Sequence, residues 1–126
     1  MAGARILVVE DNERNMKLLR DVLQASGYGT LEASDGQQAL TLAAEQSPTL
    51  VLMDMRLPDM DGIEALRRLR ADRRTASIPV LAVTAQAMKG DRERFIEAGF
   101  DGYLSKPLDI DELLAAVERH GGPDRP

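Results

Sequence analysis

The chain has 126 residues, which suffices for one domain with a hydrophobic core and is too short for two. Its formal charge of −5 disfavours binding to a nucleic-acid backbone, and the absence of cysteine excludes disulfides and thiolate metal sites. No apolar run resembles a signal peptide or reaches the length of a membrane span. We therefore expect a cytoplasmic protein with neither nucleic-acid nor membrane partners.

Short apolar runs alternate along the chain with segments that carry apolar residues at helical spacing. The five predicted strands cover residues 5–9, 28–33, 50–54, 79–84 and 101–104. The five predicted helices lie between Asn12 and Gly27, from Ser34 or Asp35 to Ser47, from Ile63 to Arg70, from Met88 to Ala98, and from Asp109 to Val117. On the fourth helix Phe95 and Ile96 are expected to point inward. The arginines of the third helix, up to Arg70, are expected to form a solvated face.

Five strands that alternate with five helices predict an α/β fold with one parallel sheet and helices on both faces. Right-handed crossovers make this a doubly wound, flavodoxin-like (βα)5 architecture, for which we expect the strand order 2-1-3-4-5. The expected organisation is a single domain over residues 4–120, followed by a disordered tail over 121–126.

Polar residues follow the carboxyl ends of the buried strands: Glu10 and Asp11 after the first, Asp54 after the third, Thr84 after the fourth and Lys106 after the fifth. In the expected strand order these ends meet at the point where ligands bind in such sheets. Three neighbouring carboxylates repel one another unless a cation lies between them, and Mg²⁺ is the hard cation that prefers oxygen ligands.

A cation at this place would also hold a phosphate oxygen. Lys106 could neutralise a second phosphoryl oxygen, and the Thr84 hydroxyl could donate a hydrogen bond to a third. With these groups in place a carboxylate can act as the nucleophile and form an acyl phosphate. The sequence therefore predicts phosphorylation of Asp54 itself.

Five motifs occur in order from Ile6 to about Val117: the pair Glu10-Asp11, the acceptor Asp54, the loop LPDMDG, Thr84-Ala85 and Lys106-Pro107. With these motifs the chain resembles the receiver domain of bacterial two-component response regulators, the CheY-like family. The segments VVEDN, NMKLL and VTAQAMKGD further resemble its single-domain DivK-like subgroup, which implies a role in cell-cycle or developmental signalling.

The resemblance implies that a histidine kinase or a histidine phosphotransfer protein donates the phosphoryl group from a phosphohistidine. It implies Mg²⁺ as the cofactor, with Mn²⁺ as a substitute. Asp11, Asp54 and the backbone carbonyl of Arg56 match the metal ligands of the family, and Glu10 would act mainly through water. Glu10 stands where Asp is more common in the family, which leaves the metal affinity open.

The resemblance also assigns residues to signalling. Tyr103 matches an aromatic switch that turns inward when Thr84 moves toward the phosphoryl group. Arg56 and Gln86 occupy places that influence the lifetime of the acyl phosphate. Without an output domain, the signal would pass by phosphorylation-dependent protein binding through the fourth helix, fifth strand and fifth helix, a face on which we expect Lys89, Arg92 and Tyr103. The expected state is a monomer or weak dimer, and the downstream protein partner is unknown.

Three other functions fit the sequence less well than this one. A haloacid-dehalogenase-like phosphatase needs a second Asp two residues after the first, where this chain has Arg56. An FMN-binding flavodoxin would need a phosphate-binding loop where Glu10 and Asp11 stand, and neither a G-x-G-x-x-G nor a Walker A motif occurs. A DNA-binding protein would need a basic surface.

Several further residues are expected to take no part in the site. Asp59 and Asp61 are interpreted as solvated loop residues, His120 as a residue without partners, and the methionines as packing residues. The isomer of the Lys106-Pro107 bond stays open.

Overall fold

The computed structural model describes residues 4–85 and 90–121, apart from the side chain of Arg92. The strands are β1 (Arg5–Val9), β2 (Gly29–Ala33), β3 (Leu50–Asp54), β4 (Val80–Thr84) and β5 (Gly102–Ser105). The helices are α1 (Glu13–Ala25), α2 (Gly36–Gln46), α3 (Gly62–Ala71), α4 (Asp91–Ala98) and α5 (Ile110–Gly121). Strands and helices alternate strictly, as predicted.

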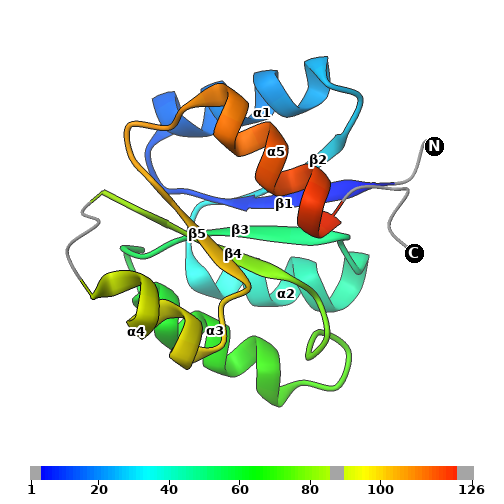
Figure 1. The fold of residues 1–126 in the computed structure, drawn as a ribbon. Helices are drawn as coiled ribbons and strands as arrows, with labels where there is room; N and C mark the ends of the chain where they lie inside the picture. Colours follow the sequence, from blue (N-terminus) through cyan, green and yellow to red (C-terminus); the bar gives the residue numbers. More distant parts are fainter. Residues whose placement is uncertain (1–3, 86–89, 122–126) are drawn as a thin grey trace.

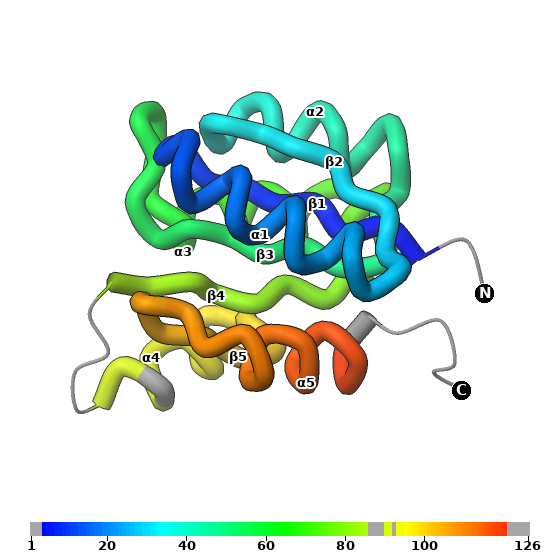
Figure 2. The backbone as a smooth tube through the Cα atoms, turned by 90° about the horizontal axis from the view of Figure 1, so that it is seen from above, coloured from blue at the N-terminus to red at the C-terminus, as the bar shows by residue number. Residues whose placement is uncertain are grey.

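The sheet is parallel throughout and has the order β2-β1-β3-β4-β5, which Figure 2 shows from above. Helices α1 and α5 cover one face of the sheet, and α2, α3 and α4 cover the other (Figure 1). The predicted fold class and strand order are confirmed. The chain passes from β1 outward to β2 and then back to β3, so the switch point lies between β1 and β3, where ligands of doubly wound sheets bind.

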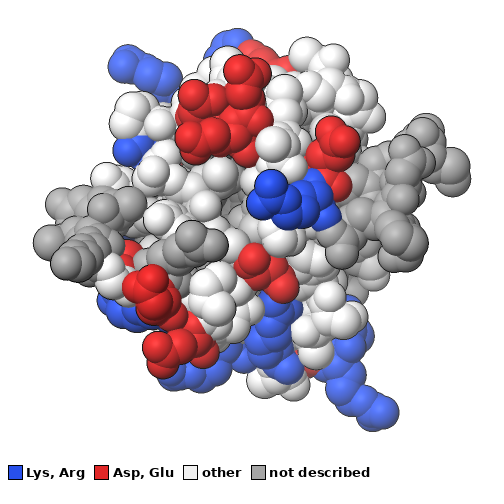
Figure 3. Space-filling model, viewed as in Figure 1, with Lys and Arg blue, Asp and Glu red and all other residues white. Residues whose placement is uncertain are grey.

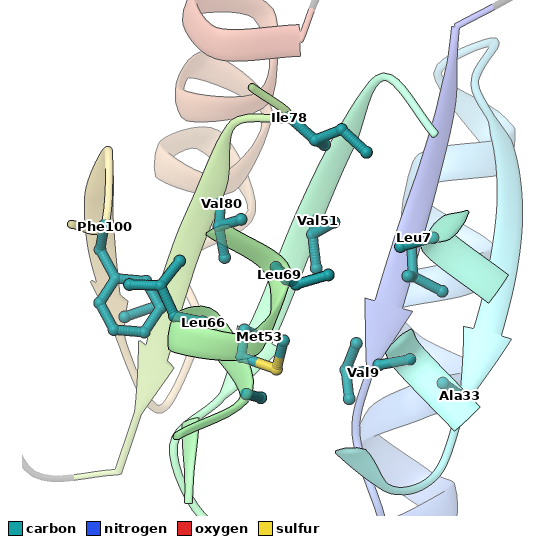
Figure 4. Close-up of a cluster of buried hydrophobic side chains, with 14 of the residues drawn as sticks. Leu7, Val9, Ala33, Val51, Met53, Leu66, Leu69, Ile78, Val80 and Phe100 are labelled. Atoms are coloured by element: carbon teal, nitrogen blue, oxygen red, sulfur yellow. The ribbon is translucent and has the colours of Figure 1, made fainter. Parts of the chain in front are cut away.

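The core consists of two aliphatic layers, one on each face of the sheet. The layer under α2, α3 and α4 contains Leu7, Val51, Met53 and Leu66, with Phe100 at its edge (Figure 4). The layer under α1 and α5 alternates with it along the same strands. All five residues of β3 are buried, which agrees with the four consecutive apolar residues that precede Asp54.

Side chains at the helix starts follow the predicted capping pattern. Asn12 accepts a hydrogen bond from the Asn15 amide at 3.0 Å, and Asp109 accepts one from the Glu112 amide at 3.1 Å. Of the two candidates for α2, Asp35 is the cap, since it accepts from the Gln38 amide at 2.8 Å.

One expectation for the fourth helix is wrong. In the structure α4 begins at Asp91, with Gly90 as its N-cap at a φ of +92°, and the predicted start at Met88 lies outside the described residues. Ile96 is 48% exposed and does not face the core, whereas Phe95 is buried. Among the residues of α4 whose side chains are described, only Phe95 is buried, so the helix turns this position toward the core.

Charged side chains cluster on the face shown in Figure 3. Acidic residues gather over the start of α5, whose first turn contains Asp111 and Glu112 and whose last turn contains Arg119. This arrangement complements the helix dipole. Among residues 4–85 and 90–121, no helix combines the length and apolarity that crossing a membrane requires.

The prediction that Arg70 belongs to a solvated face is wrong. Its side chain is only 28% exposed, and its guanidinium group donates hydrogen bonds to the carbonyls of Ala76, Ile78 and Gly99 and to Asp101. Asp101 in turn accepts from the Val80 amide at 2.8 Å. Arg70 therefore ties the end of α3 to the connections on both sides of β4, although its sequence neighbours Arg67 and Arg68 are exposed as expected.

Replacement of Arg70 by methionine should lower the free energy of unfolding by about 2 kcal/mol, because three carbonyls and a carboxylate lose a charged donor. Arg68→Met is the matched control, since the Arg68 side chain is 52% exposed and pairs with Glu64 on the same helix, and it should change stability by less than about 0.5 kcal/mol. Urea unfolding of both variants measures the difference. Equal stability of the two variants would contradict a structural role for Arg70.

Candidate functional site

The carboxyl ends of β1, β3, β4 and β5 bring five predicted site residues to one edge of the sheet. Asp54 and Thr84 are the last residues of β3 and β4, and Glu10, Asp11 and Lys106 lie just beyond β1 and β5. The Lys106 amide donates to the Thr84 carbonyl at 2.7 Å, which continues the pairing of β4 and β5 beyond Ser105. The parallel register therefore aligns residues from four separate parts of the sequence.

Three carboxylates form the centre of the site. Glu10, Asp11 and Asp54 each offer one oxygen, and these oxygens all lie within 4.8 Å of one another. Glu10 is 2% exposed and Asp54 6%, whereas Asp11 is exposed at the mouth. Such a cluster of partly buried negative charges is unfavourable without a compensating cation.

Lys106 supplies part of the compensation. Its Nζ lies 3.0 Å from Glu10 Oε1 and 3.4 Å from Asp54 Oδ2. The contact with Glu10 is an ion pair by distance, but its geometry is too poor for a hydrogen bond. Glu10 Oε1 therefore has no hydrogen-bond partner among the described residues. One ammonium group thus faces two buried carboxylates, and one buried oxygen remains poorly satisfied.

The surroundings shift the pKa of both groups. Burial raises the pKa of Glu10 above its usual value, and the nearby Asp54 charge raises it further, while Lys106 and the Asn12 amide oppose the change. Burial alone would lower the pKa of Lys106, but its contacts with Glu10 and Asp54 outweigh this effect and raise it. The two directions agree that negative charge is in excess at the site.

Hydrogen bonds from the backbone orient two of the carboxylates. The Arg56 amide donates to Asp54 Oδ1 at 3.0 Å, and the Asn12 amide donates to Glu10 Oε2 at 3.2 Å. Asp54 Oδ2 faces Lys106 instead. Each carboxylate is therefore held from one side by its own connecting loop and points its other oxygen toward the shared centre.

An open pocket surrounds the carboxylates, and its wall includes residues that the sequence did not point to. Asn15 from α1, Ile63 from α3, and Asp91 and Arg94 from α4 line the pocket together with Asp54. The Arg94 guanidinium also lies over the Phe95 ring, 5.0 Å from its centroid. No local motif marks these positions, because they reach the site only through the packing of the helices.

Asp59 and Asp61 are exposed, as expected for solvated loop residues, but each also accepts backbone hydrogen bonds that the sequence did not indicate. Asp61 caps α3 by accepting a hydrogen bond from the Glu64 amide at 2.8 Å. Asp59 accepts hydrogen bonds from the Gly36 and Gln37 amides at the start of α2. Both lie outside the carboxylate cluster that could hold a metal.

The remaining predicted residues lie farther from the carboxylates or outside the described part of the chain. Tyr103 is half-buried, with its ring centroid 5.9 Å from that of Phe95. Gln86, Lys89 and the side chain of Arg92 are not described. The Lys106-Pro107 bond is cis.

The expectation for His120 is wrong. His120 has an interaction partner and lines a groove between β5 and α5.

The donor set fits a hard divalent cation. All three candidate ligand groups are carboxylates, the nearest described cation is a single lysine, and one buried oxygen of Glu10 lacks a good hydrogen bond. Carboxylate oxygens at this spacing need only a small inward movement to share an ion of the size of Mg²⁺, whose ligands lie about 2.1 Å from it.

Comparisons with known proteins agree with this geometry. The family model for the response regulator receiver domain matches residues 6–118. The polar-differentiation response regulator DivK of Brucella ovis is 45% identical over 117 residues, which are 93% of this chain and 95% of the relative, and DivK of Brucella anthropi is equally similar.

Solved structures show the same relationship. The receiver domain of a sensor histidine kinase from Pseudomonas aeruginosa PAO1, described with a magnesium ion coordinated in its active site cleft, is 40% identical with a TM-score of 0.87, covering 96% of this chain and 99% of that one. The Vibrio cholerae chemotaxis protein CheY4 is 27% identical with a TM-score of 0.87, covering 94% and 99%.

The chain belongs to the response regulator receiver domain family. It is therefore a phosphoacceptor signalling protein of two-component systems, DivK-like in sequence, and its phosphodonor is a histidine kinase.

Proposed function

We propose that Asp54 is the phosphoacceptor of this receiver and that phosphorylation controls its binding to another protein. The observation that supports this most is the placement of Asp54. It is nearly buried at the end of the central strand, within 4.8 Å of two further carboxylate oxygens and 3.4 Å from the Lys106 ammonium group. Glu10 shares these neighbours, but it lies beyond the end of β1, whereas Asp54 is the last residue of the central strand itself.

In the proposed reaction one Asp54 carboxylate oxygen attacks the phosphorus of a phosphohistidine on the kinase or on a histidine phosphotransfer protein. The new O–P bond forms as the N–P bond breaks, and the imidazole nitrogen keeps the electron pair and takes up a proton. Lys106 neutralises one phosphoryl oxygen, and the Thr84 hydroxyl donates a hydrogen bond to another. The Arg56 amide holds the second carboxylate oxygen of Asp54 in place during the attack.

Asp11, Asp54 and the Arg56 carbonyl would hold Mg²⁺, with Glu10 at a longer distance through water. When bound, this ion supplies charge neutralisation for the carboxylates and for the phosphoryl group. Mn²⁺ has similar preferences for oxygen ligands and would substitute. Arg56 and Gln86 would influence how long the acyl phosphate lasts.

Thr84 and Tyr103 would carry the signal to the surface. Thr84 lies at the end of β4, and Tyr103 lies on the adjacent strand β5 with its ring against Phe95 of α4. A shift of Thr84 toward the phosphoryl group would leave space for the Tyr103 ring, and the partner would select the resulting state. The binding face would include Lys89, Arg92 and Tyr103, on a receiver domain extending over residues 4–120.

Intact-mass measurement after incubation with Mg²⁺ and acetyl phosphate tests this function. The unmodified protein should gain about 80 Da, one phosphoryl group, and Asp54→Asn should gain nothing. Asp61→Asn is the matched control: it also removes a pocket carboxylate, but Asn preserves the α3 cap and the gain should persist. An adduct on Asp54→Asn, or an adduct that persists in excess EDTA, would contradict the proposal.

A further inference from the structure

The loop between β3 and α3 connects the proposed phosphoacceptor to α2. Its base is closed by hydrogen bonds from the Gly62 amide to the Met55 carbonyl at 3.0 Å and from the Leu57 amide to the Met60 carbonyl at 3.2 Å. A Cβ on Gly62 would lie 2.9 Å from the Asp54 carbonyl oxygen, so only glycine allows this close approach. The loop therefore leaves β3 as a tight, hydrogen-bonded turn.

The tip of the loop is attached to a distant helix. Asp59 accepts hydrogen bonds from the Gly36 amide at 2.8 Å through Oδ1 and from the Gln37 amide at 3.0 Å through Oδ2. Beside it the Met60 side chain lies so close to Gly36 that a Cβ there would come within 2.6 Å of it. Two adjacent loop residues thus contact the start of α2, Asp59 at Gly36 and Gln37 and Met60 at Gly36.

This attachment is not needed to cap α2, which has its own cap. Asp35 already accepts a hydrogen bond from the Gln38 amide, as an N-cap residue does. Asp59 takes the two remaining amides of the first turn from 22 and 23 residues away along the chain. These hydrogen bonds join distant segments, so they restrict the conformations of the loop as well as stabilise the helix, because forming them fixes both partners.

The restraint reaches the site through Arg56. The Arg56 amide orients the Asp54 carboxylate at 3.0 Å, and Arg56 also pairs with Asp61 as an isolated antiparallel bridge across the loop. The backbone that carries the Arg56 carbonyl is therefore fixed between the closed base of the loop and its attached tip.

We propose that Asp59 is a positioning residue, whose carboxylate anchors the loop on the first turn of α2 and thereby holds the Arg56 backbone in the geometry that divalent metal binding and phosphorylation of Asp54 require. This inference rests on the roles proposed above for Asp54 and Arg56. The Gly36 amide, and with it the Gln37 amide, lowers the pKa of Asp59, so its carboxylate is ionised at neutral pH and forms charge-assisted hydrogen bonds.

The test compares Asp59→Ala with Asp35→Ala. Both variants remove an aspartate that accepts hydrogen bonds from amides in the first turn of α2, but only Asp59→Ala releases the loop. The dissociation constant of Mg²⁺ is measured by amide chemical shifts, because the chain has no tryptophan to report binding. Phosphorylation by acetyl phosphate is followed over a range of Mg²⁺ concentrations, and hydrogen exchange of the Leu57 and Gly62 amides reports closure of the loop.

In Asp59→Ala the dissociation constant should rise about three- to tenfold, less than for a direct outer-shell partner of a metal ligand, since Asp59 acts through the backbone. Phosphorylation should slow at limiting Mg²⁺ and recover at saturating Mg²⁺, and both amides should exchange faster. In Asp35→Ala the dissociation constant should stay within about twofold of the unmodified protein.

An unchanged dissociation constant in Asp59→Ala, or an equal rise in both variants, would overturn the inference; an equal rise would mean that weakening α2 is sufficient. If the unmodified protein neither binds Mg²⁺ nor forms the adduct, the proposed function fails and the inference with it. If the unmodified protein is phosphorylated while Asp59→Ala matches it at every Mg²⁺ concentration, the inference fails alone.

Discussion

Replacement of Lys106 by methionine should lower the free energy of unfolding of the metal-free protein by about 2–3 kcal/mol. Lys106 is 21% exposed and is the cation that Glu10 and Asp54 share. Methionine keeps most of the side-chain volume, so the loss comes from leaving two nearly buried carboxylates without their counter-charge. Removing one partner of a fully buried pair costs about 3–5 kcal/mol, and partial exposure reduces this value.

Lys17→Met is the matched control for Lys106→Met. Lys17 also forms an ion pair, at 2.6 Å from Asp21, but it is 68% exposed. Its replacement should cost less than about 0.5 kcal/mol, because water and salt screen exposed pairs. Denaturant unfolding in EDTA gives both values. Similar losses for the two variants would show that the carboxylates of the site do not depend on Lys106 for their charge.

Replacement of Glu10 by glutamine should have opposite effects without and with metal. Without metal at neutral pH, Glu10→Gln should raise the free energy of unfolding by about 1–2 kcal/mol, the usual cost of a buried polar oxygen that lacks a good hydrogen bond. The excess negative charge disappears, and the new amide can donate to the Asp54 carboxylate. With Mg²⁺ the unmodified protein should gain more stability than the variant, because ligand binding stabilises the folded state in proportion to affinity.

The pH dependence of the same variant follows from the direction of the pKa shift. The pKa of Glu10 is raised in the folded state, so the folded protein binds this proton more tightly than the unfolded chain does. The stability that the protonated Glu10 contributes is fully present below the pKa of Glu10 in the unfolded chain, about 4.5. It is lost as the pH rises through the pKa of Glu10 in the folded protein. Stability of the metal-free protein should therefore decline above about pH 4.5, and Glu10→Gln should remove this decline.

Thermal unfolding in EDTA from pH 4 to 8 measures the decline, and a second series with Mg²⁺ measures the gain from the ion. Asp109→Asn serves as the control, because it changes another carboxylate that caps a helix outside the site and should leave the decline in place. A lower free energy of unfolding for Glu10→Gln in EDTA at neutral pH would contradict the prediction. It would mean that Lys106 fully compensates the charge of Glu10 and that the carboxylate cluster carries no excess negative charge.

Most of the fold could be predicted from the sequence because local pattern and global topology agree. The apolar runs are short enough for strands and the amphipathic segments long enough for helices, and their strict alternation leaves few arrangements of a parallel sheet. The site centre followed from the same logic, since parallel strands present their carboxyl ends at one edge. Glu10, Asp11, Asp54, Thr84 and Lys106 could be assigned to it from their positions after strands.

The predictions from sequence were wrong or incomplete where a residue has partners that are distant in the sequence. By sequence Arg70 resembles its exposed neighbours on α3. In the structure, however, it donates hydrogen bonds to backbone carbonyls in the connection before β4 and in the connection after α4. Asp59 has the composition of a solvated loop residue, and only the placement of α2 beside the loop provides its amide partners.

The sequence by itself determined the order of strands and helices, the aliphatic core and the identity of the carboxylates and the lysine at the site, because hydrophobic period and strand-end position are properties of local sequence. Only the tertiary structure decided which side chains share charge, which loop is anchored to which helix, and which helix residues line the pocket. These features depend on distances between segments that are far apart along the chain, and such distances are set by packing.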